Sequence, residues 1–185
     1  MKKTRLHSCH EKLDAKMIEF FGWHLPVEYS GIMEEHMAVR QKAGLFDVSH
    51  MGEIIVRGEQ ALDLVQYLTP NNAAKLGPGK AQYSALTTPK GTFIDDLLVY
   101  FLNDQEYLLV VNASNVEKDH AWILGHAEHF DVTVENKSAE YSQMALQGPA
   151  AEKILRGLTD VAIEELKAFQ YKMGQVAGEE ALVSR

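Results

Sequence analysis

Apolar residues recur in several segments at the spacing of an α-helix, i, i+3 and i+4. Four segments predict helices, at residues 30–44, 59–68, 116–129 and from Gly148-Pro149 onward. In the second segment, one face is entirely apolar and carries Ala61, Leu64, Val65 and Leu68. Gly44 is expected as the C-terminal cap of the first helix, and Ser114 with Glu117 forms a capping-box pattern that opens the third. Pro149 is tolerated at the first position of the fourth.

Shorter segments with apolar residues at alternate or consecutive positions predict strands. These segments are residues 52–58, 82–88, 92–101, 106–111, 131–136 and 142–147, with two more strands within 168–185. The turn Pro89-Lys90-Gly91 joins the second strand to the third, and residues 102–105 form a hairpin loop to the fourth. Connections this short join antiparallel neighbours, so the predicted fold class is α+β, a largely antiparallel sheet with flanking helices.

No internal repeat or low-complexity linker divides the chain, so residues 1–185 are expected to form a single portion of a fold. The last residues, EEALVSR at 179–185, stop inside a strand-like pattern. Domains rarely end within a strand. We therefore expect the sequence to represent part of a longer protein.

The composition is that of a globular protein, with 46% hydrophobic and 24% charged residues. A net charge of −8 argues against nucleic acid as the main partner, because binding to phosphates requires a basic surface. The basic N-terminus lacks the apolar core of a signal peptide, and no apolar run approaches the roughly 18 residues that span a bilayer. These features predict a soluble cytoplasmic protein with no membrane partner.

Three short motifs invite a chemical interpretation, and each lacks a part that the chemistry requires. HSCH at residues 7–10 has no second ligand cluster at zinc spacing, so no metal site is expected. GPGK at residues 77–80 lacks the preceding residues of a phosphate-binding loop and the Ser or Thr that follows the lysine. DVSHMG at residues 47–52 holds the residue types of a hydrolase triad, but neighbouring side chains point in different directions. Local turn chemistry is the favoured interpretation of that loop.

The strand at residues 92–101 carries two adjacent carboxylates, Asp95 and Asp96, within an apolar run. Successive residues of a strand face opposite sides, so at least one carboxylate lies close to apolar side chains. Burying an unpaired charge costs several kcal/mol, and a partner or a functional reason is therefore expected. Alternatively, one aspartate faces solvent and the other accepts backbone hydrogen bonds, as is common near turns. Periodicity leaves open which aspartate faces a pocket.

Several longer segments resemble the N-terminal half of the aminomethyltransferase, or T-protein, family of the glycine cleavage system. The resemblance runs from about Lys12 to the last residue, and its most specific parts are GLFDVSHMGE, TFIDDLLVY, YLLVVNASNVEKD and MALQGPAA. It implies a tetrahydrofolate-dependent enzyme. Such an enzyme takes the aminomethyl group from the lipoyl arm of a lipoylated H-protein, passes the methylene carbon to tetrahydrofolate and releases ammonia.

The resemblance also assigns roles to individual residues. It implies Asp96 as the catalytic acid and a folate site lined by Met51, Tyr83, Asp96, Tyr100 and Asn112. Positive charge develops near the folate nitrogen that attacks the methylene carbon, and a fixed carboxylate in a poorly hydrated pocket can stabilise it. The family pattern thus selects Asp96, which the strand pattern could not do.

The sequence also departs from the family pattern. Only Gly22 of the usual glycine pair precedes the tryptophan. The family sequence continues with a Thr-Gly-Tyr-Thr-Gly-Glu motif, which is absent because the given sequence ends at Arg185, where the motif would start. The Glu of that motif helps to hold the folate pterin. Two alternatives to the enzyme therefore stay open: a folate-binding module without transferase activity, and an inactive truncated fragment.

Overall fold

The computed structural model describes all residues 1–185 and divides the chain into two compact units. The first, here called the N-terminal unit, comprises Met1–His50, Ser142–Glu165 and Met173–Ala181. The second, the sheet unit, comprises Met51–Tyr141, Leu166–Lys172 and Leu182–Arg185. Helices and antiparallel strands are mixed throughout, which confirms the predicted α+β class. None of the helices has the length and apolar character needed to pass through a membrane.

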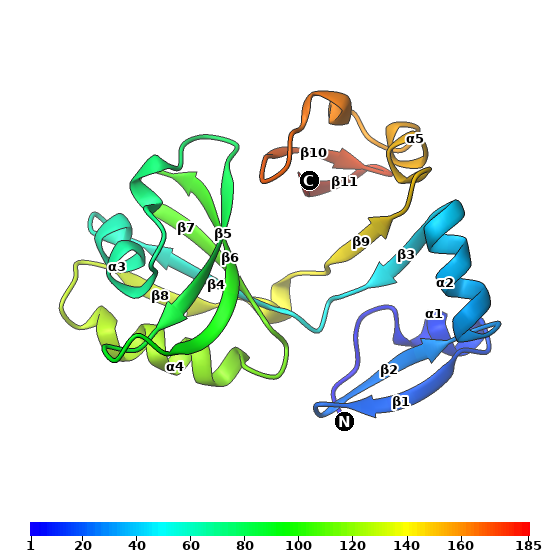
Figure 1. The fold of residues 1–185 in the computed structure, drawn as a ribbon, viewed down its shortest axis with the longest axis horizontal. Coiled ribbons are helices and arrows are strands. Elements are labelled where there is room, and N and C mark those ends of the chain that lie inside the picture. Colours follow the sequence, from blue (N-terminus) through cyan, green and yellow to red (C-terminus); the bar gives the residue numbers. More distant parts are fainter. The chain divides into compact units, whose positions relative to one another are not determined.

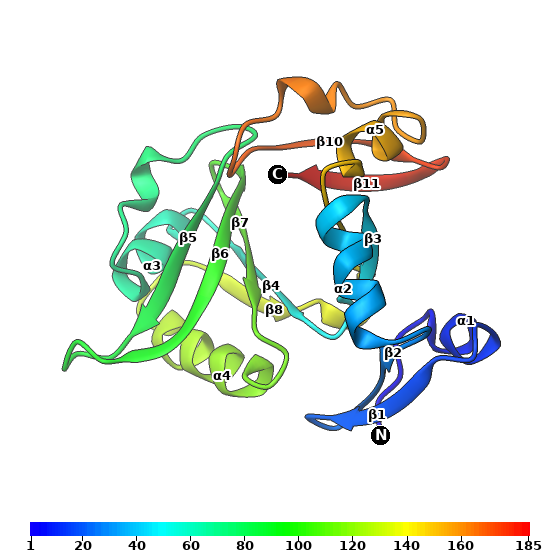
Figure 2. The ribbon, with the colours of Figure 1, turned by 45° about the vertical axis from the view of Figure 1, so that its right-hand side comes forward.

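A five-stranded antiparallel sheet forms the centre of the sheet unit, in the order β5-β6-β7-β4-β8. Figure 2 shows β6, the longest strand, running between β5 and β7. The strands are β4 (Gly52–Arg57), β5 (Ala81–Thr87), β6 (Phe93–Asn103), β7 (Glu106–Val111) and β8 (Thr133–Asn136). All five were predicted from apolar patterning, and the turn through Gly91 joins β5 to β6 as expected, with the glycine at φ +77°.

One face of this sheet is covered by the helices α3 (Ala61–Leu68) and α4 (Val116–Ala127) (Figure 1). The apolar face predicted for α3 is completely buried against the sheet, together with Ile123 of α4. The capping-box prediction was wrong, because the N-cap of α4 is Asn115 and no side chain caps this helix. A short 3₁₀ turn, η1 (Ala73–Lys75), follows α3 within the predicted turn region.

The opposite face of the sheet carries a second, smaller apolar cluster. Its buried members are Ile55, Ala81, Tyr100, Leu108, Val110 and Tyr171. Tyr171 begins β10 (Tyr171–Val176), which pairs with β11 (Glu179–Ser184), and its hydroxyl donates to the carbonyl of Phe101. This contact holds the base of the predicted C-terminal hairpin against β6.

The N-terminal unit is built from short elements that the apolar pattern mostly did not predict. They are α1 (His7–Lys12), β1 (Lys16–Phe20), β2 (Trp23–Glu28), α2 (Ile32–Gln41), β3 (Gly44–Asp47), β9 (Met144–Gln147), α5 (Ala151–Arg156) and the 3₁₀ turn η3 (Ile163–Glu165). Another 3₁₀ turn, η2 (Ser138–Glu140), belongs to the sheet unit. Strands β1 and β2 form a hairpin, and β3 pairs with β9 from far along the chain.

Two terminal predictions in this unit were wrong. The predicted cap Gly44 is instead the first residue of β3, and Lys42 caps α2. Helix α5 begins at Ala151, so Pro149 precedes the helix instead of occupying its first position. Both boundaries lie at one tertiary contact. The backbone N–H of Ala150 donates to the carbonyl of Lys42, which joins the end of α2 to the start of α5.

Candidate functional site

Asp95 and Asp96 lie on opposite faces of β6. Asp96 stands opposite Ala85 of β5 on the face that lacks helices, and its side chain is exposed. Asp95 stands opposite Leu86 on the helix-covered face and is buried. The alternation expected of a strand therefore gives each carboxylate a different environment, one in solvent and one beneath α4.

The exposed carboxylate of Asp96 is held by two side chains from neighbouring strands. The Tyr83 hydroxyl of β5 donates to Oδ2 at 2.5 Å, and the Asn112 amide, directly after β7, donates to Oδ1 at 3.0 Å. The hydrogen bond to Asp96 raises the pKa of Tyr83 above its ordinary value, so the phenol keeps its proton and remains a donor. Hydrogen bonds to an ionised group are short and strong, and together they fix the direction of this carboxylate.

Asn112 also connects Asp96 to the buried carboxylate behind it. Its Nδ2 lies 3.0 Å from Oδ1 of Asp95, and its backbone N–H lies 3.4 Å from Oδ2. Burial opposes ionisation of Asp95, but hydrogen bonds from Asp119, Asn112 and Asn115 outweigh burial and lower its pKa. Asp95 is thus an ionised, buried acceptor.

A third carboxyl group, Asp119 of α4, lies behind Asp95 and is 0% exposed. No N–H or O–H donor lies within hydrogen-bond distance of its oxygens, and the Lys118 ammonium is 3.9 Å from Oδ1. Burial together with the neighbouring Asp95 raises the pKa of Asp119 to about 8. Asp119 is therefore protonated at neutral pH and donates its proton towards Asp95. Two carboxyl groups this close share one proton because both cannot ionise.

An open groove of about 610 Å³ runs along β5 and β6 at Asp96. It is lined by Pro70, Asn71, Tyr83, Ser84, Ala85, Phe93, Ile94, Asp95 and Asp96. The side chain of Asn71 supports one wall by donating to the carbonyl of Tyr83 at 2.7 Å. Phe93, an exposed aromatic residue, thus lines the same groove as the fixed carboxylate.

The structure brings together three of the sequence-predicted site residues and separates two. Tyr83, Asp96 and Asn112 are in direct contact. Tyr100 shares their face but lies four residues further along β6, about 13 Å away at a rise of about 3.3 Å per residue. Its ring is buried against Tyr171, and its hydroxyl lies 3.0 Å from Ser184 Oγ. Met51 is half-buried, packs against the second apolar cluster and is not part of the groove lining.

Sequence reasoning missed Glu53 and Asp119, two buried acids near this region. Glu53 of β4 is 3% exposed, shares a sheet face with Met51, and has an Oε2 atom without a hydrogen-bond partner. Burial raises its pKa to about 7. The sequence signal for both is a single carboxylate within an otherwise apolar strand or helix face, the same signal that the Asp95-Asp96 pair gives more strongly.

The loop DVSHMG contains one local turn contact, as the sequence indicated, but its other side-chain hydrogen bonds reach distant parts of the N-terminal unit. The Ser49 hydroxyl donates to the carbonyl of Gln143 at 3.3 Å, while Asp47 accepts the Ser49 backbone N–H at 3.1 Å. The histidine that contacts Asp47 is the distant His10, at 2.9 Å, and not its neighbour His50. No serine–histidine contact forms, so no hydrolase relay is present.

Comparison with known proteins identifies the fold and the family. The chain is 47% identical over its whole length to an aminomethyltransferase of Desulfitobacterium hafniense strain DSM 10664 / DCB-2, of which it covers 51%. It is 52% identical to an aminomethyltransferase of Geobacillus kaustophilus, again covering 51%. The crystal structure of the glycine cleavage system aminomethyltransferase T from Bartonella henselae matches 92% of this chain and 46% of its own, with a TM-score of 0.86 and 36% identity.

The chain therefore spans about half the length of the curated relatives that it matches. The model of the GCVT N-terminal domain matches residues 6–185, almost the entire sequence. The chain belongs to the GCVT N-terminal domain family.

Proposed function

We propose that this chain supplies the catalytic carboxylate and part of the tetrahydrofolate site of an aminomethyltransferase. The observation that carries the proposal is the exposed Asp96 carboxylate, which Tyr83 and Asn112 hold in one direction at the edge of an open groove. The relatives named aminomethyltransferase support the same reaction class.

In the proposed reaction, a nitrogen of tetrahydrofolate attacks the methylene carbon that is bonded to the lipoyl sulfur and to the amino nitrogen. The carbon passes to the folate, ammonia leaves, and the lipoyl group remains as a dithiol. Asp96 faces the nitrogen that becomes positively charged, orients it and accepts its proton. Phe93 and Tyr83 offer aromatic surface for a planar ring in the groove.

The donor in this proposal is the lipoylated H-protein, and the expected location is the cytoplasm. Met51 and Tyr100 extend the proposed folate site along the same sheet face, further from the reacting nitrogen. Neither residue lines the groove at Asp96, so the proposal assigns them contacts with a part of the ligand that is remote from the reacting nitrogen.

Asp96→Asn and Tyr83→Phe test the proposal. Calorimetric titration of the wild-type chain with tetrahydrofolate is expected to show saturable one-to-one binding. With lipoylated, aminomethyl-loaded H-protein, and with the C-terminal half of the Geobacillus kaustophilus relative added, Asp96→Asn should lower transfer by about 10²–10⁴-fold. Tyr83→Phe should weaken folate binding, because the groove loses a hydroxyl and Asp96 loses a donor.

Asp104→Asn, in the exposed hairpin loop between β6 and β7, is the matched control and should change neither the transfer rate nor the affinity for folate. Folate binding with no transfer under any of these conditions would identify the chain as a folate-binding module without transferase activity. Full activity of Asp96→Asn would contradict the assignment of the catalytic carboxylate.

A further inference from the structure

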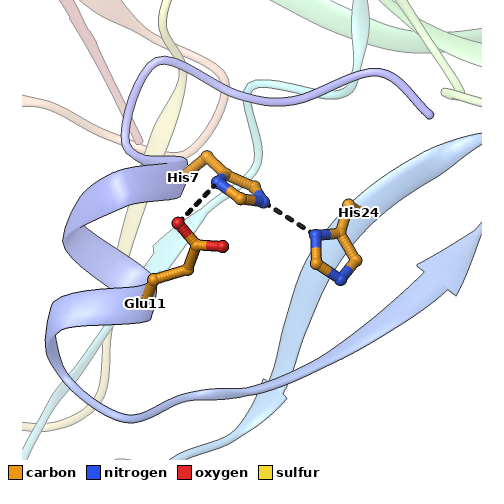
Figure 3. A group of neighbouring side chains, drawn as sticks. All are labelled: His7, Glu11 and His24. Carbon is orange, nitrogen blue, oxygen red and sulfur yellow. Dashed lines mark hydrogen bonds and ion pairs between the residues drawn. The ribbon is translucent and has the colours of Figure 1, made fainter.

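Three side chains that can bind a metal ion meet in the N-terminal unit, whereas the carboxylate site belongs to the sheet unit. His7 and Glu11 lie one turn apart on α1, and His24 faces them from β2 (Figure 3). His7 Nε2 lies 2.8 Å from His24 Nδ1, and His7 Nδ1 lies 3.4 Å from Glu11 Oε2. One potential ligand atom from each residue lies within 4.8 Å of the other two.

The burial of this group is graded from the inside outward. His7 is 5% exposed, His24 is half-buried, and the side chain of Glu11 is 54% exposed. Two imidazole nitrogens are therefore positioned by packing, while the Glu11 carboxylate, 3.4 Å from His7 Nδ1, lies at the solvent side.

We propose that His7, Glu11 and His24 form a binding site for a borderline divalent cation such as Zn²⁺. The two facing imidazole nitrogens share a single proton in the absence of an ion, because only one of them can donate to the other. A zinc ion takes the place of this proton, which moves to the other nitrogen of its own ring. Both imidazoles therefore bind as neutral ligands, with one nitrogen of each about 2.0–2.1 Å from the ion. The nitrogens need to separate by only a few tenths of an ångström for this geometry.

Glu11 completes the protein ligands with a carboxylate oxygen, and a water molecule fills the fourth position. Two histidines, one carboxylate and a water form a common zinc coordination set. Mg²⁺ and Ca²⁺ prefer oxygen ligands, so this mixed nitrogen and oxygen site selects against them. A bound ion connects α1 to the β1–β2 hairpin and thereby stabilises the N-terminal unit, because an ion that binds only the folded state favours folding.

The site differs from the one that the local motif suggests. In HSCH, His10 is already engaged by Asp47 at 2.9 Å and by the Tyr29 hydroxyl at 2.8 Å, and Cys9 is exposed. The missing ligand comes from His24, which lies 17 residues beyond His7 and is brought close only by the packing of β2 on α1. For this reason the motif alone predicted no metal site.

Calorimetric titration of the whole chain with ZnCl₂ tests the proposal. One equivalent is expected to bind, the melting temperature should rise, and MgCl₂ should give neither effect. His24→Gln and Glu11→Gln each remove a proposed ligand and should weaken zinc binding by more than the about 10–100-fold that loss of an outer-shell partner costs. Both replaced side chains lie at the wetter side of the site, so the metal-free variants should unfold at the wild-type temperature, whereas substitution of the buried His7 could also disturb folding.

Two control variants distinguish this site from adventitious binding. Cys9→Ser removes the exposed thiol of the same helix, and His129→Gln removes an exposed histidine beyond α4. Both should retain wild-type zinc affinity. Absence of saturable zinc binding by the folded chain would overturn the proposal, as would zinc binding that persists unchanged in both His24→Gln and Glu11→Gln.

Discussion

Asn112 contacts both members of the aspartate pair, and this single amide connects the exposed face of β6 to the interior beneath α4. A protonated Asp119 donates to Asp95, Asp95 accepts from Asn112, and Asn112 donates to Asp96. Burial and the neighbouring Asp95 keep the proton on Asp119 up to a pH of about 8. The exposed carboxylate is therefore linked, through Asn112 and Asp95, to a proton that is held in the core.

That buried proton predicts how the stability of the protein depends on pH. The folded-state pKa of Asp119, about 8, lies above the ordinary value of 3.8. Between these values the folded protein binds a proton that the unfolded chain releases, so the free energy of unfolding falls as pH rises. The contribution is fully present below about pH 4, and the slope reaches at most about 1.4 kcal/mol per pH unit. The raised pKa of Glu53 makes the free energy of unfolding fall in the same way between pH 4.5 and about pH 7.

Urea unfolding of the wild-type chain and of Asp119→Asn at about pH 6.5 and about pH 8 measures this slope. The amide that replaces the carboxyl group in this variant cannot ionise, yet it can still donate to Asp95. The variant should therefore lose less stability than the wild-type protein over this interval. Glu128→Gln, at an exposed position after α4, is the control and should keep the wild-type slope. Equal slopes for Asp119→Asn and the wild-type chain would show that Asp119 is ionised in the folded state.

At the scale of elements, local pattern predicted the sheet unit much better than the N-terminal unit. Helix α3 and strands β4 and β7 each bury apolar residues. In the sequence these residues recur at helical spacing in α3 and form uninterrupted apolar runs in β4 and β7, so the elements could be predicted. Strands β1 and β3 have mostly exposed or half-buried residues and no clear alternation. The partner of β3 is β9, a strand nearly a hundred residues later, and no local pattern in the sequence indicates this pairing.

Two glycines in the sheet unit predict opposite effects of the same substitution. Gly58, which follows β4, has φ +146°, and a Cβ there would collide with the carbonyl oxygen of Asp131. Gly58→Ala should therefore lower the free energy of unfolding by about 1–3 kcal/mol, through strain and displacement of backbone. Gly125 lies within α4 with open space around it, so Gly125→Ala should raise the free energy of unfolding by up to about 1 kcal/mol.

Denaturant unfolding of the two single variants measures both effects under the same conditions, each serving as the control for the other. A Gly58→Ala variant as stable as the wild-type chain would mean that the close approach of residues 58 and 131 is not maintained in solution. A less stable Gly125→Ala variant would contradict the prediction for α4.

At the scale of the whole molecule, helix α2 buries none of its residues, although its apolar residues recur at helical spacing. Ile32 is 60% exposed, Met33 74% and Met37 42%. Clusters of exposed apolar side chains are unusual on monomeric proteins and promote association.

We therefore expect the isolated chain to self-associate as its concentration rises. Gel filtration of a dilution series should show an elution volume that moves towards larger species at higher concentration. The double variant Ile32→Gln with Met33→Gln should reduce this shift, whereas Met173→Gln, at an exposed position on β10, should not. A concentration-independent monomer in the wild-type chain would show that the exposed residues of α2 do not drive association.

Local sequence pattern was enough to establish the α+β class, the strands of the main sheet, the buried face of α3 and the placement of Asp95 and Asp96 on opposite sides of one strand. These features follow from the periods of helix and strand, which act over a few residues. The packing of whole elements established which face of the sheet the helices cover, and hence that Asp96 is the exposed carboxylate. Packing also brings Asp119 to Asp95, and His24 to His7 and Glu11. Such contacts join residues that are distant in the chain, and no local pattern records them.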